Sequence, residues 1–273
     1  MLNAINTHGL LLLGCGKMGG AMLAGWLERG VKPSAVWVID PHPSDQLRGL
    51  LGAGLNLNTD LPEAPAICVI AVKPQMMGAA LPAIAALANR NTVFVSIAAG
   101  TTLAALGAAL GTQARIIRAM PNTPAAVGRG ITAIIGNANA SQDDLDLAED
   151  VLKAVGQVVR LETEAQIDAV TAVSGSGPAY VFHLIETMAA AGEAQGLPPE
   201  MALHLARATV AGAGALAENA PEDPGQLRVN VTSPNGTTAA ALAVLMDAET
   251  GFPALLNRAI AAAANRAREL GAS

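Results

Sequence analysis

The fold of this 273-residue chain is indicated most clearly by one segment, Leu10-Leu11-Leu12-Leu13-Gly14-Cys15-Gly16-Lys17-Met18-Gly19. Its leucine run predicts a buried strand, and the Gly-x-Gly-x-x-Gly pattern then opens a helical stretch. In this context Gly14 permits a tight turn, Gly16 lets the backbone approach a pyrophosphate, and Gly19 lets helix and strand pack closely. Asp40 follows at the spacing expected of a carboxylate that binds a ribose hydroxyl. The strand, helix and acid together favour a dinucleotide-binding turn over a glycine turn in an unrelated α/β fold. Its residues are Gly14, Cys15, Gly16, Lys17, Met18 and Gly19.

The rest of the first half alternates short apolar runs with helical stretches. Runs such as Ile67–Val72 are nearly continuous in apolar residues, which is typical of a parallel strand covered on both faces. Helical stretches, including Gly19–Arg29 and Gln75–Ala88, lie between the runs. This order predicts a doubly wound, Rossmann-like α/β domain over residues 1–162. The other strands expected in it are Leu10–Leu13, Val36–Ile39, Thr92–Ile97, Arg115–Met120, Thr132–Ile135 and Gln157–Leu161.

Strand patterns end near Glu164, and residues 163–273 are predicted to form an all-α domain. Within it, Met201–Leu216 carries several Ala and Gly residues, and so smooth a face suits close helix packing. We therefore expect a second subunit to complete this domain, although a monomer stays open. The expected helices are Pro178–Gln195, Pro199–Asn219, Thr238–Met246 and Pro253–Leu270.

Composition excludes several classes of partner. Apolar residues make up 52% of the chain, aromatic residues only 2%, and the net charge is −6, which argues against a nucleic-acid partner. No uninterrupted apolar run is long enough for a membrane span. The first residues lack the pattern of a signal peptide, and Cys15 and Cys68 form no disulfide framework. We therefore expect a cytoplasmic protein.

Asp40 ends the second predicted strand. A carboxylate at this position binds the ribose 2′-hydroxyl of NAD and repels the 2′-phosphate of NADP. His42 and Arg48 lie nearby in sequence and can soften that preference. The alternative is that Asp40 is a turn residue before Pro41. The pattern favours NADH with tolerance of NADPH.

Three further strand ends carry small or polar residues. Ligands in open α/β sheets gather at this edge, so the three ends predict one continuous crevice. Lys73 can contact phosphate or ribose there, or be solvated, and small residues after the next strand leave room for a flat ring. Each segment also fits a plain loop. The cofactor-binding candidates among them are Ala71, Val72, Lys73 and Pro74, then Ala98, Ala99 and Gly100, and finally Asn122.

A polar break, Asn230-Val231-Thr232-Ser233-Pro234-Asn235-Gly236-Thr237-Thr238, interrupts the alanine-rich half. Its Pro-Asn-Gly turn precedes a helix that Thr237 or Thr238 can cap. Because a helix start offers free N–H groups and a positive dipole end, it can hold a carboxylate. Taken alone, the break also fits an ordinary capped helix start.

These segments resemble the pyrroline-5-carboxylate reductase family. The resemblance rests on Asp168–Tyr180, which contains Ser-Gly-Ser-Gly-Pro-Ala-Tyr, and on Asn230–Thr238. The stretches Ala-Val-Lys-Pro, Ser-Ile-Ala-Ala-Gly and Met-Pro-Asn-Thr-Pro also match in order, and the likeness covers about Gly9 to Leu270.

The resemblance implies an NADPH- or NADH-dependent oxidoreductase that reduces the cyclic imine of 1-pyrroline-5-carboxylate to L-proline, the last step of proline biosynthesis. It implies a homodimer interlocked through the helical domain, with larger rings left open. Thr238 would hydrogen-bond the ring nitrogen as the catalytic candidate, and the N–H groups of Thr237 and Thr238 would hold the carboxylate. The other substrate-binding candidates are Asn230, Gly236, Ser174 and Ser176; Asn58 and Glu164 join the cofactor-binding set with Asp40.

Two positions depart from the family pattern. Asn235 stands where the family usually has glycine, but asparagine also tolerates a left-handed backbone. Asp40 stands where small or basic residues are often seen, so an NADP preference is open to question.

Other functions stay open as alternatives. A related cyclic imino acid reductase differs only in the size of its substrate. A β-hydroxyacid dehydrogenase needs a lysine on its helical domain, and no lysine follows Lys153. His183 and His204 are possible acid–base groups, but their apolar surroundings favour packed structural histidines. An NAD(H)-sensing module is the non-enzymatic alternative, and it would need no polar residues like Asn230–Thr238.

No metal site is predicted, because no Cys/His pair has ligand spacing. The clustered acids Asp143, Asp144 and Asp146 are interpreted as a solvated helix start favoured by the helix dipole.

Overall fold

The computed structural model describes residues 2–89 and 91–272. Within them, one sheet has the strand order β3-β2-β1-β4-β5-β6-β7-β8. Neighbouring strands run parallel except β6 and β7, which are antiparallel. The strands are β1 (Leu10–Leu13), β2 (Val36–Ile39), β3 (Asn56–Leu57), β4 (Ile67–Ile70), β5 (Val93–Ser96), β6 (Arg115–Met120), β7 (Gly130–Gly136) and β8 (Gly156–Arg160). The predicted Rossmann-like sheet is confirmed; β3 and the antiparallel direction of β7 were not predicted.

Helices cover both faces of this sheet, as a doubly wound fold requires. Strand side chains alternate between two buried clusters: Leu10 and Leu12 belong to one, Leu11 and Leu13 to the other. The first cluster takes most of its α-helical residues from α2 (Lys17–Glu28) and α6 (Gln142–Leu152), and the second takes its own from α4 (Met77–Ala80) and α5 (Leu103–Leu110). Burial of each leucine stabilises the fold by about 1.5–3 kcal/mol.

The helix predicted at Gln75–Ala88 is wrong. The chain there breaks into η3 (Pro74–Met76), α4, η4 (Leu81–Ala83) and η5 (Ala85–Asn89). Pro82 explains the break, because it has no N–H to donate and its ring clashes with the preceding turn. It stands instead near the start of the new 3-10 turn η4. The short helices α1 (Leu2–His8), α3 (Asp45–Gly49) and α10 (Pro224–Asn230) were not predicted either.

The acidic start of α6 is only partly solvated, which corrects the sequence interpretation. Asp144 is 5% exposed. It forms a capping box with Ser141 and an ion pair with Arg115, with 2.9 Å between Nη1 and Oδ1. The cap explains the burial, because N3 of a capping box turns back toward the backbone of the N-cap residue.

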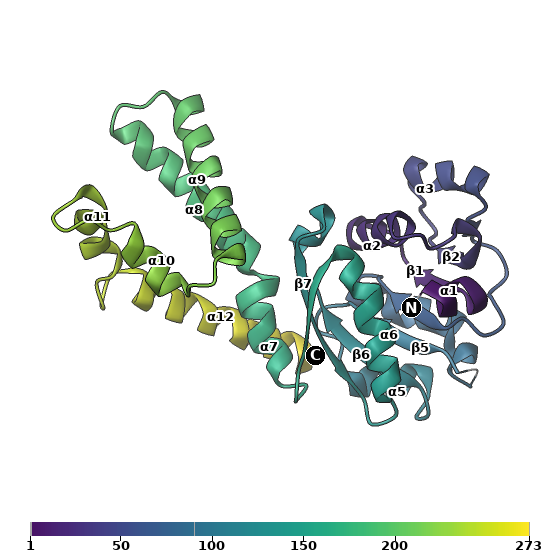
Figure 1. Cartoon of the computed structure of the whole chain (residues 1–273). Helices are drawn as coiled ribbons and strands as arrows, with labels where there is room; N and C mark the ends of the chain where they lie inside the picture. The colour runs from purple at the N-terminus through teal and green to yellow at the C-terminus, as the bar shows by residue number, and fades with distance from the viewer. Residues whose placement is uncertain (1, 90, 273) are drawn as a thin grey trace. The chain divides into compact units, whose positions relative to one another are not determined.

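The chain divides into two compact units. One extends to Gly175 and also takes in the end of the chain from Ala264, and the other is Ser176–Ala263. The second unit contains α8 (Gly177–Ala194), α9 (Pro199–Asn219), α10, α11 (Thr237–Leu245) and most of α12 (Phe252–Ala272). Figure 1 shows α8 and α9 side by side. The domain boundary between residues 162 and 163 stays a prediction.

The end of α12 packs within the first unit. A Cβ atom added to Gly100, in the loop after β5, would lie 3.5 Å from the carbonyl oxygen of Leu270. The end of α12 therefore lies beside the loop after β5.

The helical unit buries little of its own apolar surface. Its buried cluster consists of Ala189, Ala202 and Ala206, with Ile185 packed against them. His183 has 75% of its side chain exposed and His204 is exposed as well, so the expectation of packed histidines is wrong for the single chain. Large apolar side chains exposed on this unit include Val181, Phe182, Met188, Met201, Leu205, Leu216, Val229, Val244, Met246, Phe252, Leu255 and Leu256. In the part of the chain that the structure describes, no helix combines the length and the apolarity that a bilayer crossing needs.

Candidate active site

Gly14 and Gly19 have the backbone environments that their spacing predicts, and Gly16 lies beside open space. Gly14 has φ +87°, a left-handed conformation that favours glycine. A Cβ on Gly19 would lie 2.5 Å from the carbonyl oxygen of Gly14, so only glycine permits this helix–strand contact. A Cβ on Gly16 would meet no atom within 4 Å. Gly16 is also the N-cap of α2 and no side chain caps it, so open space and uncapped N–H groups together fit a pyrophosphate.

Asp40 is bonded to the glycine turn. Its Oδ2 accepts the Cys15 N–H at 2.7 Å and its Oδ1 accepts the His42 N–H at 2.8 Å. Asn58, at φ +52°, fixes the backbone of Asp40: its Oδ1 accepts the Asp40 N–H and its amide donates to the Asp40 carbonyl oxygen. Asp40 is therefore held at the junction of β2 and the turn. The predicted ribose contacts of Asp40 and Asn58 stay predictions.

Cys15 is a protonated thiol in this turn. Burial, with a smaller contribution from the Asp40 carboxylate, raises its pKa to about 11. Burial also raises the pKa of the Cys68 thiol in β4. Neither cysteine is therefore activated as a nucleophile.

The other strand-end candidates lie at one edge of the sheet. They follow β4, β5 and β6, which are neighbours in the parallel part of the sheet, so their carboxyl ends share that edge. Val72 packs beside Gly14, and Ala98 is buried. Lys73 is exposed. Asn122 Oδ1 accepts the Ile131 N–H at 2.9 Å and so fixes the approach to β7. Ala71, Pro74, Ala99 and Gly100 complete these loops.

Partly exposed Glu164 forms an ion pair with the buried Arg118, and this pair was not predicted. Its Oε1 lies 2.7 Å from Nη1 of Arg118 and accepts the Leu103 N–H at 2.8 Å. Arg118 is a charged residue in the apolar strand β6, and this pattern break is the sequence signal that could have revealed it.

A π-helix, Thr171–Gly175, follows α7 (Gln166–Val170). Ser174 donates its hydroxyl to the Val170 carbonyl oxygen at 3.1 Å, and Ser176 has helical dihedrals and no side-chain cap bond. The idea that these serines cap α8 is therefore wrong: the Ser174 hydroxyl bonds one turn back along its own helix, and Ser176 has helical dihedrals instead of the extended backbone that a capping side chain needs. A Cβ on Gly175 would lie 2.7 Å from Cε of Met120, so glycine lets the π-helix approach the end of β6. Such π-helical turns are frequent at functional sites.

In the helical unit, the polar break forms the start of α11. Asn235 has φ +59°, which confirms that asparagine can take this left-handed position. Gly236 is the N-cap and no side chain caps the helix, so the expected capping by Thr237 or Thr238 is wrong. Both threonines lie inside the first turn instead, where their N–H groups precede the helical bonding pattern. Asn230 ends α10, and its Oδ1 accepts a hydrogen bond from Gln226 at 2.7 Å.

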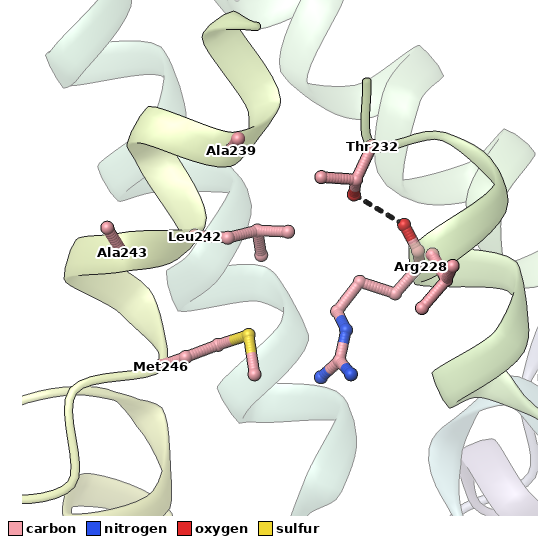
Figure 2. A pocket seen from close by; sticks show the side chains of 7 residues that line it. Arg228, Thr232, Ala239, Leu242, Ala243 and Met246 are labelled. Atoms are coloured by element: carbon pink, nitrogen blue, oxygen red, sulfur yellow. Dashed lines mark hydrogen bonds between the residues drawn. The ribbon is translucent and has the colours of Figure 1, made fainter. Parts of the chain in front are cut away.

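A groove of about 410 Å³ lies between α10 and α11 (Figure 2). Thr232 donates its hydroxyl to the Arg228 carbonyl oxygen at 2.6 Å on one side, and Leu242 and Met246 come from α11 on the other. None of the predicted substrate-binding residues lines it. Within their own units, the structure brings together Gly236, Thr237 and Thr238, and separately the glycine turn with Asp40 and Asn58.

Comparisons with known proteins cover both halves of the chain. The profile of pyrroline-5-carboxylate reductase dimerisation matches residues 164–270, and that of NADP oxidoreductase, coenzyme F420-dependent, matches residues 10–100. Pyrroline-5-carboxylate reductase from Pseudomonas aeruginosa is 39% identical, over 97% of this chain and 98% of the relative. The chain belongs to the pyrroline-5-carboxylate reductase family. The resemblance stated from the sequence is confirmed, and so is the fold class.

Other members of the pyrroline-5-carboxylate reductase family are similar to this chain in sequence and in fold. The Escherichia coli enzyme is 38% identical over 96% of this chain and 97% of its own. The structure of the Coxiella burnetii enzyme has a TM-score of 0.90 at 33% identity, covering 97% of this chain and 98% of that one. The Plasmodium falciparum pyrroline carboxylate reductase, solved with NADP bound, has a TM-score of 0.81 at 27% identity, covering 97% and 99%.

Proposed function

We propose that this chain reduces 1-pyrroline-5-carboxylate to L-proline with NADPH or NADH. Family membership along nearly the whole chain carries the proposal. The uncapped start of α11 and the open glycine turn fit the two ligands it requires, a carboxylate and a dinucleotide.

The bound cofactor supplies the hydride. The chain binds the substrate, orients it and polarises its C=N bond. The N–H groups of Thr237 and Thr238 hold the substrate carboxylate at the positive end of the α11 dipole. The Thr238 hydroxyl donates to or accepts from the ring nitrogen. The other proposed substrate contacts are made by Asn230, Gly236, Ser174 and Ser176. These contacts fix which face of the imine is presented to the nicotinamide.

The cofactor is held by the first unit. The glycine turn, from Gly14 to Gly19, binds the pyrophosphate, and Asp40 and Asn58 lie toward the adenosine ribose. The loops containing Lys73, Gly100 and Asn122 surround the nicotinamide half, with Glu164 beside them. Because Asp40 is anionic, we expect NADH to be used well alongside NADPH.

The active form is a homodimer joined through the helical unit, and its exposed apolar side chains support this assembly. Assembly into larger rings and a cytoplasmic location are further parts of the proposal.

Oxidation of NADH and NADPH by the purified protein, with 1-pyrroline-5-carboxylate as substrate, tests the reaction. We expect Thr238→Ala to lower kcat by about 10²-fold with unchanged cofactor affinity, because it removes one polarising group. Thr232→Ala is the matched control, since its hydroxyl is bonded within the chain. Cofactor binding without oxidation of either nucleotide would contradict the proposal and direct the search to six-membered cyclic imines, then to an NAD(H)-sensing role.

A further inference from the structure

Arg118 is a buried cation in the middle of the sheet. Only 7% of its side chain is exposed. It pairs in register with Ser96 of β5 and Ile135 of β7, so β6 is flanked on both sides. Ile116, two residues earlier, belongs to the cluster under α5, and alternation along the strand places Arg118 on that same face. A lone guanidinium there would be costly, so its partner matters.

That partner is one oxygen of Glu164. Oε1 receives both the Arg118 guanidinium, at 2.7 Å, and the Leu103 N–H, at 2.8 Å. Glu164 is 32% exposed, whereas Arg118 is almost covered. Among the described residues, Oε2 of Glu164 has no hydrogen bond, so one oxygen of this partly exposed carboxylate is without a donor.

The pair connects three segments that surround the proposed cofactor crevice. Leu103 begins α5, directly after the loop that contains Ala98 and Gly100. Arg118 precedes the end of β6 at Met120 by two residues. Glu164 precedes α7 and the π-helix that packs on Met120. Arg118 thus sets where the Glu164 carboxylate stands relative to the strand ends.

We propose that Arg118 is a positioning residue for the nicotinamide cofactor. It holds Glu164 so that Oε2 accepts a hydrogen bond from a hydroxyl or amide N–H of the bound dinucleotide. The inference rests on the proposed function for the identity of the ligand, and it assigns the cofactor, rather than the imine, as the molecule affected.

Direct titration of NADPH and NADH against the protein without imine tests the proposal. We expect Arg118→Met to weaken cofactor binding about tenfold, as for the loss of an oriented charge-assisted hydrogen bond. Arg118→Lys should recover part of the affinity, because a point charge reaches the same oxygen. In steady state, the cofactor KM should rise while the imine KM changes little.

A double-mutant cycle separates positioning from structural support. If Arg118 acts through Glu164, Arg118→Met should have no further effect on cofactor affinity in a Glu164→Ala background. Arg115→Met is the matched control, because Arg115 begins the same strand and pairs with Asp144 at its amino end. It should lower thermal stability without changing cofactor affinity.

Equal affinities for Arg118→Met and Arg115→Met, or additive losses with Glu164→Ala, would overturn the proposal. If Arg118→Met does not fold, unchanged affinities in Arg118→Lys and Glu164→Gln would overturn it as well. Because binding is measured without imine, the proposal can hold even if 1-pyrroline-5-carboxylate is not the substrate; the two failures are therefore distinguishable.

Discussion

Asp40 uses both carboxylate oxygens to hold backbone N–H groups of its own chain. Its negative charge is consequently fixed beside the glycine turn. We expect Asp40→Ala to shift the ratio of kcat/KM for NADPH over NADH upward by about tenfold, because repulsion of a 2′-phosphate is removed. The shift is measured with each nucleotide at saturating imine.

The exposed acid Asp45, in the first turn of α3, provides the control for Asp40. Asp45→Ala should leave the ratio unchanged. An equal ratio in the wild type and Asp40→Ala would mean that Asp40 serves only to hold the turn.

Cys15 gives a prediction for pH. Its pKa of about 11 lies above the ordinary thiol value, so the folded state binds this proton more tightly than the unfolded state does. Its contribution to stability is therefore complete below the ordinary pKa and is lost as pH rises toward 11. We expect iodoacetamide to leave Cys15 nearly unmodified at about pH 8 and to react faster only near its raised pKa, as followed by mass spectrometry.

The guanidinium-unfolded chain is the reference for this thiol. Both cysteines should react readily there at the same pH. Rapid modification of native Cys15 at neutral pH would show that its thiolate is accessible and contradict the assignment.

At the scale of elements, helix α6 depends on its N-terminal cap. Ser141 accepts the Asp144 N–H while Asp144 accepts the Ser141 N–H. We expect Ser141→Ala to lower the free energy of unfolding by about 1 kcal/mol, because one N–H of the first turn loses its acceptor. Denaturant unfolding measures the loss. The exposed Ser34→Ala should cost much less, and equal losses would refute the role of the cap.

Elements with strong local signals were predictable from the sequence. The leucine run of β1, the glycine turn and the helix at Pro199–Asn219 all appear at the expected positions. Local sequence patterns did not predict elements whose structure depends on pairing with residues far along the chain. The two-residue strand β3 is fixed by pairing with Trp37 and Val38, and β7 turns antiparallel beside β6.

The candidate site divides in the same way. The turn at Gly14 and the close packing at Gly19 could be predicted from spacing alone, since each is a backbone property, whereas the pyrophosphate contact of Gly16 stays a prediction. The charge of Arg118 within an apolar strand signals a special role, but its partner could not be assigned, because Glu164 lies 46 residues away. The sequence also placed the N-cap of α11 one or two residues too late. Gly236 is the N-cap residue, and Thr237 and Thr238 are the first residues of the helix.

For the whole molecule, the helical unit gives a prediction about assembly. Phe182 and Leu216 are 59% and 55% exposed in a single chain that has only small residues buried in this unit. We expect sedimentation to give twice the chain mass of 27.4 kDa, and Phe182→Asp to lower the dimer fraction and the melting temperature. Leu51→Asp, at a residue 49% exposed in the first unit, is the control and should remain dimeric. A monomeric wild type at micromolar concentration would contradict the interface.

The return of α12 to the first unit makes the helical unit an insertion with two covalent tethers. The chain leaves the first unit after Gly175 and re-enters it at Ala264. A protease that cuts once between these points, for example in the exposed stretch between α9 and α10, leaves each fragment holding part of the first unit. Release of the helical unit as a separate piece requires two cuts, and until the second is made the end of α12, packed beside the loop after β5, helps to hold the nicked chain together.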